Sequence, residues 1–173
     1  MQEGIQNFTG LINQLIIHLN RVSDVGYSEQ HSLLCGSTIG EHVRHIYNFP
    51  ECLLQGVHSG VVNYDKRIRD TKLQSDKQYA IASLLNQSNY ILNLDHYENK
   101  SLVLEVSTRE GEISRMETNL RRELHYITEH TVHHMAILRM AMKFHFPKME
   151  IDDSFGFAYS TINYKNVQRQ KQI

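Results

Sequence analysis

The feature that most constrains this fold is a long apolar stripe in the last third of the chain. Over residues 119–145, apolar side chains recur at steps of three or four, which places them on one face of a helix. Pro147 disfavours helical backbone in the residue before it, so we expect the helix to end at about His145. A helix of about 25 residues is about 37 Å long. Such a helix needs long partners to cover its apolar face, which predicts lengthwise packing against other helices.

Three earlier segments carry apolar residues at the same spacing: residues 3–23, residues from 38 to about 57, and residues 75–97. Thr38 followed by Glu41 matches a capping box and marks the start of the second of these helices. Pro50 lacks the amide that would bond the carbonyl of Ile46, so a kink or an early end is expected there. Four amphipathic helices predict an all-α fold, an antiparallel four-helix bundle.

A small β-hairpin is expected before the last helix. Leu102, Leu104 and Val106 alternate with Val103, Glu105 and Ser107, residues 109–111 supply a turn that contains glycine, and residues 112–116 return. We expect a single domain, with the four-helix bundle over residues 1–147 and a C-terminal tail over residues 148–173 packed on the bundle.

A long connection over residues 58–74 fits neither helical nor strand spacing, and connections of this length inside a domain are often functional. It contains Asp65, Arg67 and Arg69. A structural loop held by ion pairs is the favoured interpretation of these residues, and their chemistry is left unassigned.

Charge and composition exclude several classes of protein. The chain of 173 residues has a formal net charge of −1, so it lacks the basic surface that a nucleic-acid-binding protein needs. Residues 1–6 are polar and unlike a secretion leader, and no apolar run approaches the roughly 20 residues that cross a bilayer. Cys35 and Cys52 are too few for a disulfide framework and fit a reducing cytosol. We therefore expect a cytoplasmic protein with no nucleic-acid or membrane partner.

Eleven histidines are the unusual element of the composition. His130 and His134 lie four residues apart on the expected last helix, so their rings project from one face and can hold one metal ion. About 0.7 such pairs are expected by chance, so the spacing alone is a weak indication. His134 also occupies a core position of the apolar stripe, where a polar ring without a partner costs about 1–3 kcal/mol.

A second pair, His42 and His45, lies near the apolar face of the helix that begins at Thr38. If this helix contacts the last one, three or four imidazoles converge inside the bundle. The alternative is that these are ordinary surface or half-buried histidines. His133 points about 100° away from His134, so we expect it to be exposed or to lie behind the ligands. The remaining histidines are expected at the surface: His18, His31, His58, His96, His125 and His145.

Two segments resemble the metal-ligand segments of the DinB-like (YfiT-like) superfamily. Residues 38–46, Thr-Ile-Gly-Glu-His-Val-Arg-His-Ile, look like the first segment. Residues 122–134, Arg-Glu-Leu-His-Tyr-Ile-Thr-Glu-His-Thr-Val-His-His, look like the second. The resemblance covers nearly the whole chain, including the hairpin and residues 155–161 of the tail.

The resemblance implies a four-helix bundle, often a homodimer, in which three histidines hold a divalent metal ion, commonly zinc or nickel. On this chain the ligands fall on His45, His130 and His134. His45 is preferred to His42 because the ligand of the superfamily ends its segment immediately before an apolar residue, here Ile46. His42 stays the alternative ligand.

Three neutral imidazoles leave at least one coordination position open, as in catalytic rather than closed structural sites. Relatives in the superfamily include thiol-dependent S-transferases and isomerases. The resemblance therefore implies a low-molecular-weight thiol whose thiolate attacks an electrophilic small molecule. We expect a divalent-metal-dependent enzyme that acts on a small-molecule substrate, a thiol S-transferase or a hydrolase.

No residue is assigned as a catalytic acid or base, but two are weighed. Glu123 lies two turns before His130 and can accept a hydrogen bond behind the ligands, although a solvated residue paired with a basic side chain is favoured. Arg44 adjoins His45 and can bind an anionic substrate group, although an arginine there more often faces solvent or pairs with a carboxylate. The lack of a clear acid–base pair motivates the alternative function, a non-catalytic metal-binding dimerisation module.

Overall fold

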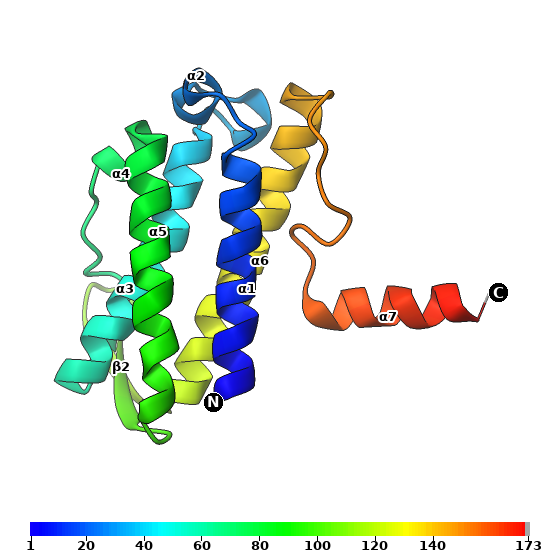
Figure 1. Ribbon diagram of the computed structural model, residues 1–173. Coiled ribbons are helices and arrows are strands. Elements are labelled where there is room, and N and C mark those ends of the chain that lie inside the picture. The colour runs from blue at the N-terminus through cyan, green and yellow to red at the C-terminus, as the bar shows by residue number, and fades with distance from the viewer. Residues whose placement is uncertain (172–173) are drawn as a thin grey trace.

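The apolar faces of four long helices meet in one core, and Figure 1 shows these helices standing side by side. The structure is a computed structural model that describes residues 1–171. The long helices are α1 (Gln2–Leu19), α3 (Ile39–Ser59), α5 (Lys77–Leu92) and α6 (Leu120–His145). Helices α1 and α3 each contact both α5 and α6. Within the described part of the chain, none of the helices combines the length and the apolar character that crossing a bilayer requires.

Side-chain caps begin the two helices that carry the paired histidines. The predicted capping box is present: the Thr38 hydroxyl accepts from the amide of Glu41 at 2.9 Å, and the Glu41 carboxylate accepts from the amide of Thr38 at 2.9 Å. The side chain of Asn119 caps α6 by accepting from the amide of Arg122 at 3.0 Å. These caps satisfy amides that the first turn of a helix otherwise leaves unpaired.

Pro50 removes one backbone donor from α3 but does not end the helix. The helix continues through Pro50 to Ser59, so the early end considered at this position is wrong. Pro50 itself is buried, and Leu53 and Val57 continue the apolar face into the core beyond it. Burial of these side chains stabilises the helix across the missing hydrogen bond.

A three-stranded sheet accompanies the helices. The predicted hairpin is present as β2 (Ser101–Ser107) and β3 (Ile113–Asn119), which pair antiparallel. A further strand, β1 (Val61–Asn63), pairs parallel with the other edge of β2. Val62 of β1 is fully buried, and a Cβ added at Gly56 of α3 would approach its Cγ2 to 2.5 Å. The small residue at position 56 therefore lets this strand pack directly on α3.

The expectation of an all-α fold, a four-helix bundle with one small hairpin, is wrong. The described residues form seven α-helices and a mixed three-stranded sheet. The shorter or additional helices are α2 (Asp24–Ser28), α4 (Lys72–Ser75) and α7 (Tyr159–Gln170). Strand β1 is only three residues long, too short for an alternating pattern to appear in the sequence. Helix α7 buries none of its residues, so it lies outside the core that the four apolar faces predict.

The C-terminal segment is anchored before α7 begins. Phe155 is fully buried and stacks on His18, with ring centroids 4.1 Å apart. The Nδ1 atom of His18 donates to the carbonyl of Gln14 at 2.7 Å, and its Nε2 accepts from the amide of Asp152 at 3.2 Å. His18 and His31 are both buried, so their expected positions at the surface are wrong. Beyond this anchor α7 projects away from the long helices (Figure 1).

Two glycines give a matched test of the packing around α3. Gly40 and Gly4 both lie in the first turn of a helix, where alanine is favoured over glycine by up to about 1 kcal/mol. A Cβ at Gly40 would collide with the backbone carbonyl of Gln74, whereas one at Gly4 would meet only the Leu124 side chain, at 3.2 Å. We expect Gly40→Ala to lower the free energy of unfolding in urea by at least about 1–3 kcal/mol. Gly4→Ala should leave it unchanged or raise it, and equal stability of the two variants would contradict the packing described.

Candidate metal centre

The contact between α3 and α6 brings histidines from both helices together. His45 lies on the second turn of α3, and His130 and His134 lie on successive turns of α6. One ring nitrogen from each of these three residues lies within 4.8 Å of the other two, which is close enough for all three to bind one metal ion. The three side chains are half-buried. The residues that the sequence predicted as ligands therefore converge, and their coordination of a metal stays a prediction.

The shortest approach in this group joins the Nε2 atoms of His45 and His130, at 2.9 Å. The ring of His134 lies 4.5 Å from that of His45 and 4.7 Å from that of His130, measured between centroids. Ligand nitrogens of a tetrahedral zinc site are about 3.3 Å apart, because each Zn–N bond is about 2.0–2.1 Å long. The spacing of the three ring nitrogens, within 4.8 Å of one another, is therefore comparable to that of ligands around one zinc ion.

His42 contacts this group from outside. Its Nδ1 lies 3.0 Å from the Nδ1 of His134, and His42 is not one of the three residues whose nitrogens converge. The contact occupies one nitrogen of His134 and leaves its Nε2 for another partner. A metal-binding histidine ordinarily hydrogen-bonds through its second ring nitrogen, which sets the orientation of the ring. The position of His42 fits this supporting role better than that of the alternative ligand.

Burial keeps these imidazoles neutral. Loss of hydration, reinforced by the charges of neighbouring histidines, lowers the pKa of His45 to about 4 and the pKa of His134 to about 3. Burial also lowers the pKa of His130 and the pKa of His42. At neutral pH each ring is therefore uncharged and has one nitrogen with a free lone pair, which is the form that binds metal ions.

The group is covered by an aromatic ring in one direction and adjoins a hollow in another. Phe49 stacks on His130 with ring centroids 3.9 Å apart, and its centroid lies 4.8 Å from that of His45. An open hollow of about 220 Å³ is lined by Ser37, Glu41, His42, Arg44, His45 and His134. The Nε of Arg44 is buried and has no hydrogen-bond partner within the described part of the chain.

Glu123 lies outside the histidine group. Its side chain is 1% exposed, so the solvated position favoured from the sequence is wrong. One carboxylate oxygen accepts from the hydroxyl of Tyr64 at 2.7 Å, and the other accepts from the hydroxyl of Thr118 at 2.6 Å. Its hydrogen bonds therefore join α6 to the sheet and to the connection after β1 rather than to a candidate ligand.

Arg67 is a residue near the site that sequence patterns leave without a role. Its guanidinium lies over the ring of Phe49, 5.9 Å from the centroid. Its positive charge also contributes to the lowered pKa of His45 and of His130. It belongs to the connection between β1 and α4, where the spacing of apolar residues gives no position for any side chain. His133, by contrast, is exposed as expected.

The two cysteines are unlike the histidines in their surroundings. Cys35 is exposed in the loop before α3, and Cys52 is buried on α3. Burial raises the pKa of the Cys52 thiol to about 11, so it stays protonated at neutral pH. A protonated thiol is a poor metal ligand, which agrees with the histidine-only composition of the group.

Comparison with known proteins adds no relative from which a function can be transferred. No family model matches the chain. Neither a curated protein nor a solved structure matches it. The function is therefore inferred from the residues of this site and their geometry.

The lowered histidine pKa values predict acid sensitivity of the metal-free protein. Well above pH 6.5 these imidazoles are neutral in both the folded and the unfolded chain. As the pH falls from 6.5 to about 4, the unfolded chain takes up protons that folded His45 and His134 do not accept, so the free energy of unfolding falls. Urea denaturation at several pH values measures this loss.

The variant His134→Gln removes one of the most strongly shifted groups, so its stability should fall less across the same pH range. His58→Gln is the matched control, because His58 lies exposed on α3. His58→Gln should lose stability with the same pH dependence as the unmodified chain. If His134→Gln does so too, the neutral state of the folded His134 side chain is refuted.

Proposed function

We propose that this protein is a divalent-metal-dependent enzyme that acts on a small molecule. The observation that carries the proposal is the convergence of ring nitrogens from His45, His130 and His134 beside an open hollow. Structural metal sites are closed by four protein ligands, whereas catalytic sites keep one position for water or substrate. A non-catalytic metal-binding dimerisation module calls for a closed site, so the hollow favours an enzyme over this alternative.

The residues around the group have separable roles in this proposal. A divalent cation held by His45, His130 and His134 would lower the pKa of water or of a thiol at the open position. His42 holds the ring of His134 through their contact at Nδ1, and Phe49 keeps water from the face of His130 on which it stacks. Arg44 lines the hollow and carries a permanent positive charge, so it is the residue that would hold an anionic group of the substrate.

In its finer form the proposal is a thiol S-transferase of the DinB-like kind. The support is the resemblance of residues 38–46 and 122–134 to the ligand segments of that superfamily. Imidazole donors suit zinc and nickel, which are the metals proposed here. A low-molecular-weight thiol is the proposed second substrate, and the homodimer common in the superfamily belongs to the same proposal.

Metal content tests the proposal at its base. Protein purified without an affinity tag should contain about one zinc or nickel ion per chain by elemental analysis, and a chelator should lower its melting temperature. Each of His130→Gln and His134→Gln should weaken zinc binding more than about 100-fold, because losing a ligand exceeds the cost of losing an outer partner. His133→Gln is the control, since His133 is exposed beside them. Equal zinc affinity of all three variants would refute the ligand assignment.

Turnover tests the finer proposal. Cysteine and monochlorobimane form a fluorescent thioether as the S–C bond forms, chloride leaves the carbon, and the thiol proton passes to solvent. We expect zinc- or nickel-loaded protein to accelerate this conjugation and His134→Gln to abolish the acceleration. Arg44→Gln should raise the KM for cysteine, whose carboxylate is the anionic group, more than it lowers kcat. A conjugation rate that does not depend on the metal would contradict a metal-dependent transferase.

A further inference from the structure

A second cavity, of about 290 Å³, lies between the sheet and helices α3 and α6. Aromatic rings of Phe49, Tyr64 and Tyr126 form part of its wall. Strands β2 and β3 add apolar side chains to the lining: Leu104, Val106 and Met116. Its volume is at the lower limit of small-molecule sites, which is suited to a ligand of about one ring. None of the three candidate metal ligands lines it.

The charged residues that line this cavity differ in the hydrogen-bond and ion-pair partners that they already have. The Glu123 carboxylate already accepts from two hydroxyls, and Asp65 accepts from the amide of Ser107 at 2.9 Å. Arg67 donates to the carbonyl of Tyr64 at 2.8 Å, and among the side chains that the structure describes no carboxylate lies within ion-pair distance of its guanidinium. The acids are thus supplied with donors, while Arg67 makes no direct ion pair with either of them and interacts with the charge of Asp65 only at longer range.

A second guanidinium lies on the same cavity. Arg122 also lines it, and its nearest approach to a carboxylate is 4.0 Å, to the already hydrogen-bonded Glu123. Its guanidinium lies 5.4 Å from the centroid of Tyr126, as that of Arg67 lies 5.9 Å from the centroid of Phe49. Each cation is therefore placed beside an aromatic wall, so an anion bound by them has a flat apolar surface next to it.

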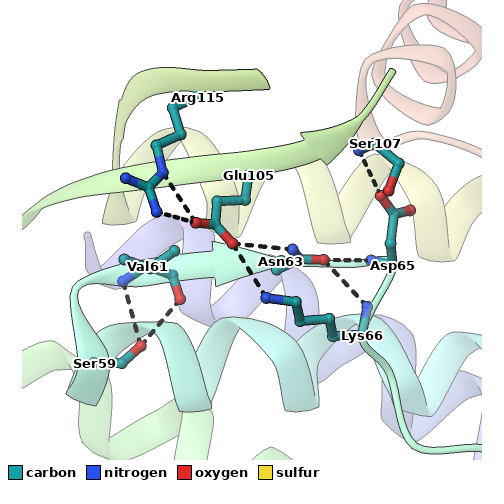
Figure 2. Close-up of polar contacts among 8 residues, drawn as sticks. All are labelled: Ser59, Val61, Asn63, Asp65, Lys66, Glu105, Ser107 and Arg115. Atoms are coloured by element: carbon teal, nitrogen blue, oxygen red, sulfur yellow. Dashed lines mark hydrogen bonds and ion pairs between the residues drawn. The ribbon is translucent and has the colours of Figure 1, made fainter. Parts of the chain in front are cut away.

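The segment that carries Tyr64 and Arg67 is held to the sheet by side-chain hydrogen bonds. Figure 2 shows the side chain of Asn63 accepting from the amides of Asp65 and Lys66 and donating to Glu105. Glu105 of β2 is buried and also binds Arg115 and Lys66. This network fixes the turn after β1, so the cavity wall is formed before any ligand binds, which limits the ordering cost of binding.

We propose that this cavity binds a small aromatic carboxylate, with its ring between the aromatic walls and its carboxylate on Arg67 and Arg122. Guanidinium groups bind carboxylates through paired, charge-assisted hydrogen bonds, and three aromatic rings favour a flat apolar body. The proposal goes beyond the metal-dependent activity and does not rest on it. Phe49 is the one residue common to both, since it lines the cavity and stacks on His130.

Benzoate is the probe for this site, and benzamide is its uncharged counterpart. In a ligand-observed NMR titration of the metal-free protein, benzoate should bind saturably and at least about tenfold more tightly than benzamide or acetate. Arg122→Gln should weaken benzoate binding at least about tenfold, and because this residue is exposed the variant is expected to fold. Arg67→Gln should have the same effect. Arg69→Gln is the matched control, since Arg69 is exposed on the same connection.

Three results would overturn the proposal. The first is the absence of saturable benzoate binding, and the second is equal binding of benzoate and benzamide. The third is benzoate binding that needs zinc or is lost in Arg44→Gln, because the anion would then lie at the histidine group rather than in this cavity. A chain that binds benzoate but no metal would support the cavity while refuting the proposed metal-dependent activity, so the two can fail separately.

Discussion

Helices α3 and α6 pack against each other along the core, and this contact holds histidines of both helices within reach of one another. Val43 and Ile46 of α3 and Ile127 of α6 are fully buried beside the histidines, so apolar burial fixes the spacing of the two helices. The histidines themselves gain little from that position, because each imidazole loses hydration there. The apolar contacts therefore stabilise an arrangement in which the imidazoles lose hydration. That cost is offset only when the rings share a hydrogen bond or bind one cation.

The loss of hydration at the contact between α3 and α6 explains why the imidazoles of the site are uncharged. Burial lowers the pKa of His45 to about 4, so the group resists protonation and keeps lone pairs available at neutral pH. The Nε2 atoms of His45 and His130 face each other at 2.9 Å. This approach is favourable only when one of them carries a proton and donates it to the other, or when both bind one cation. The adjoining hollow, which His134 lines, favours the proposed chemical role over a structural one.

Local signals in the sequence located the parts of the site that depend on regular helices. The capping box at Thr38 and the four-residue spacing of His130 and His134 both predicted where side chains lie, because helical geometry repeats over short distances. Parts that depend on contacts between distant segments were missed. Strand β1 is held by Val62 packing on α3 and by pairing with β2, and neither contact leaves a period in the sequence.

The same limit applies to side chains of the connection after β1. Arg67 reaches the ring of Phe49, and Tyr64 reaches the carboxylate of Glu123, through a turn whose shape is set by Asn63. Glu123 was expected in solvent, paired with a basic side chain, but the sheet covers it. The sequence predicted only part of this sheet, so the burial of Glu123 could not be inferred from the residues of α6 alone.

X-ray absorption spectroscopy of the zinc-loaded protein tests the central claim most directly, because it counts the donor atoms around the metal. Convergence of His45, His130 and His134 predicts three imidazole nitrogens at about 2.0–2.1 Å and one further light-atom ligand from solvent. A zinc environment that contains sulfur, or that consists of oxygen donors without imidazole, would contradict the account.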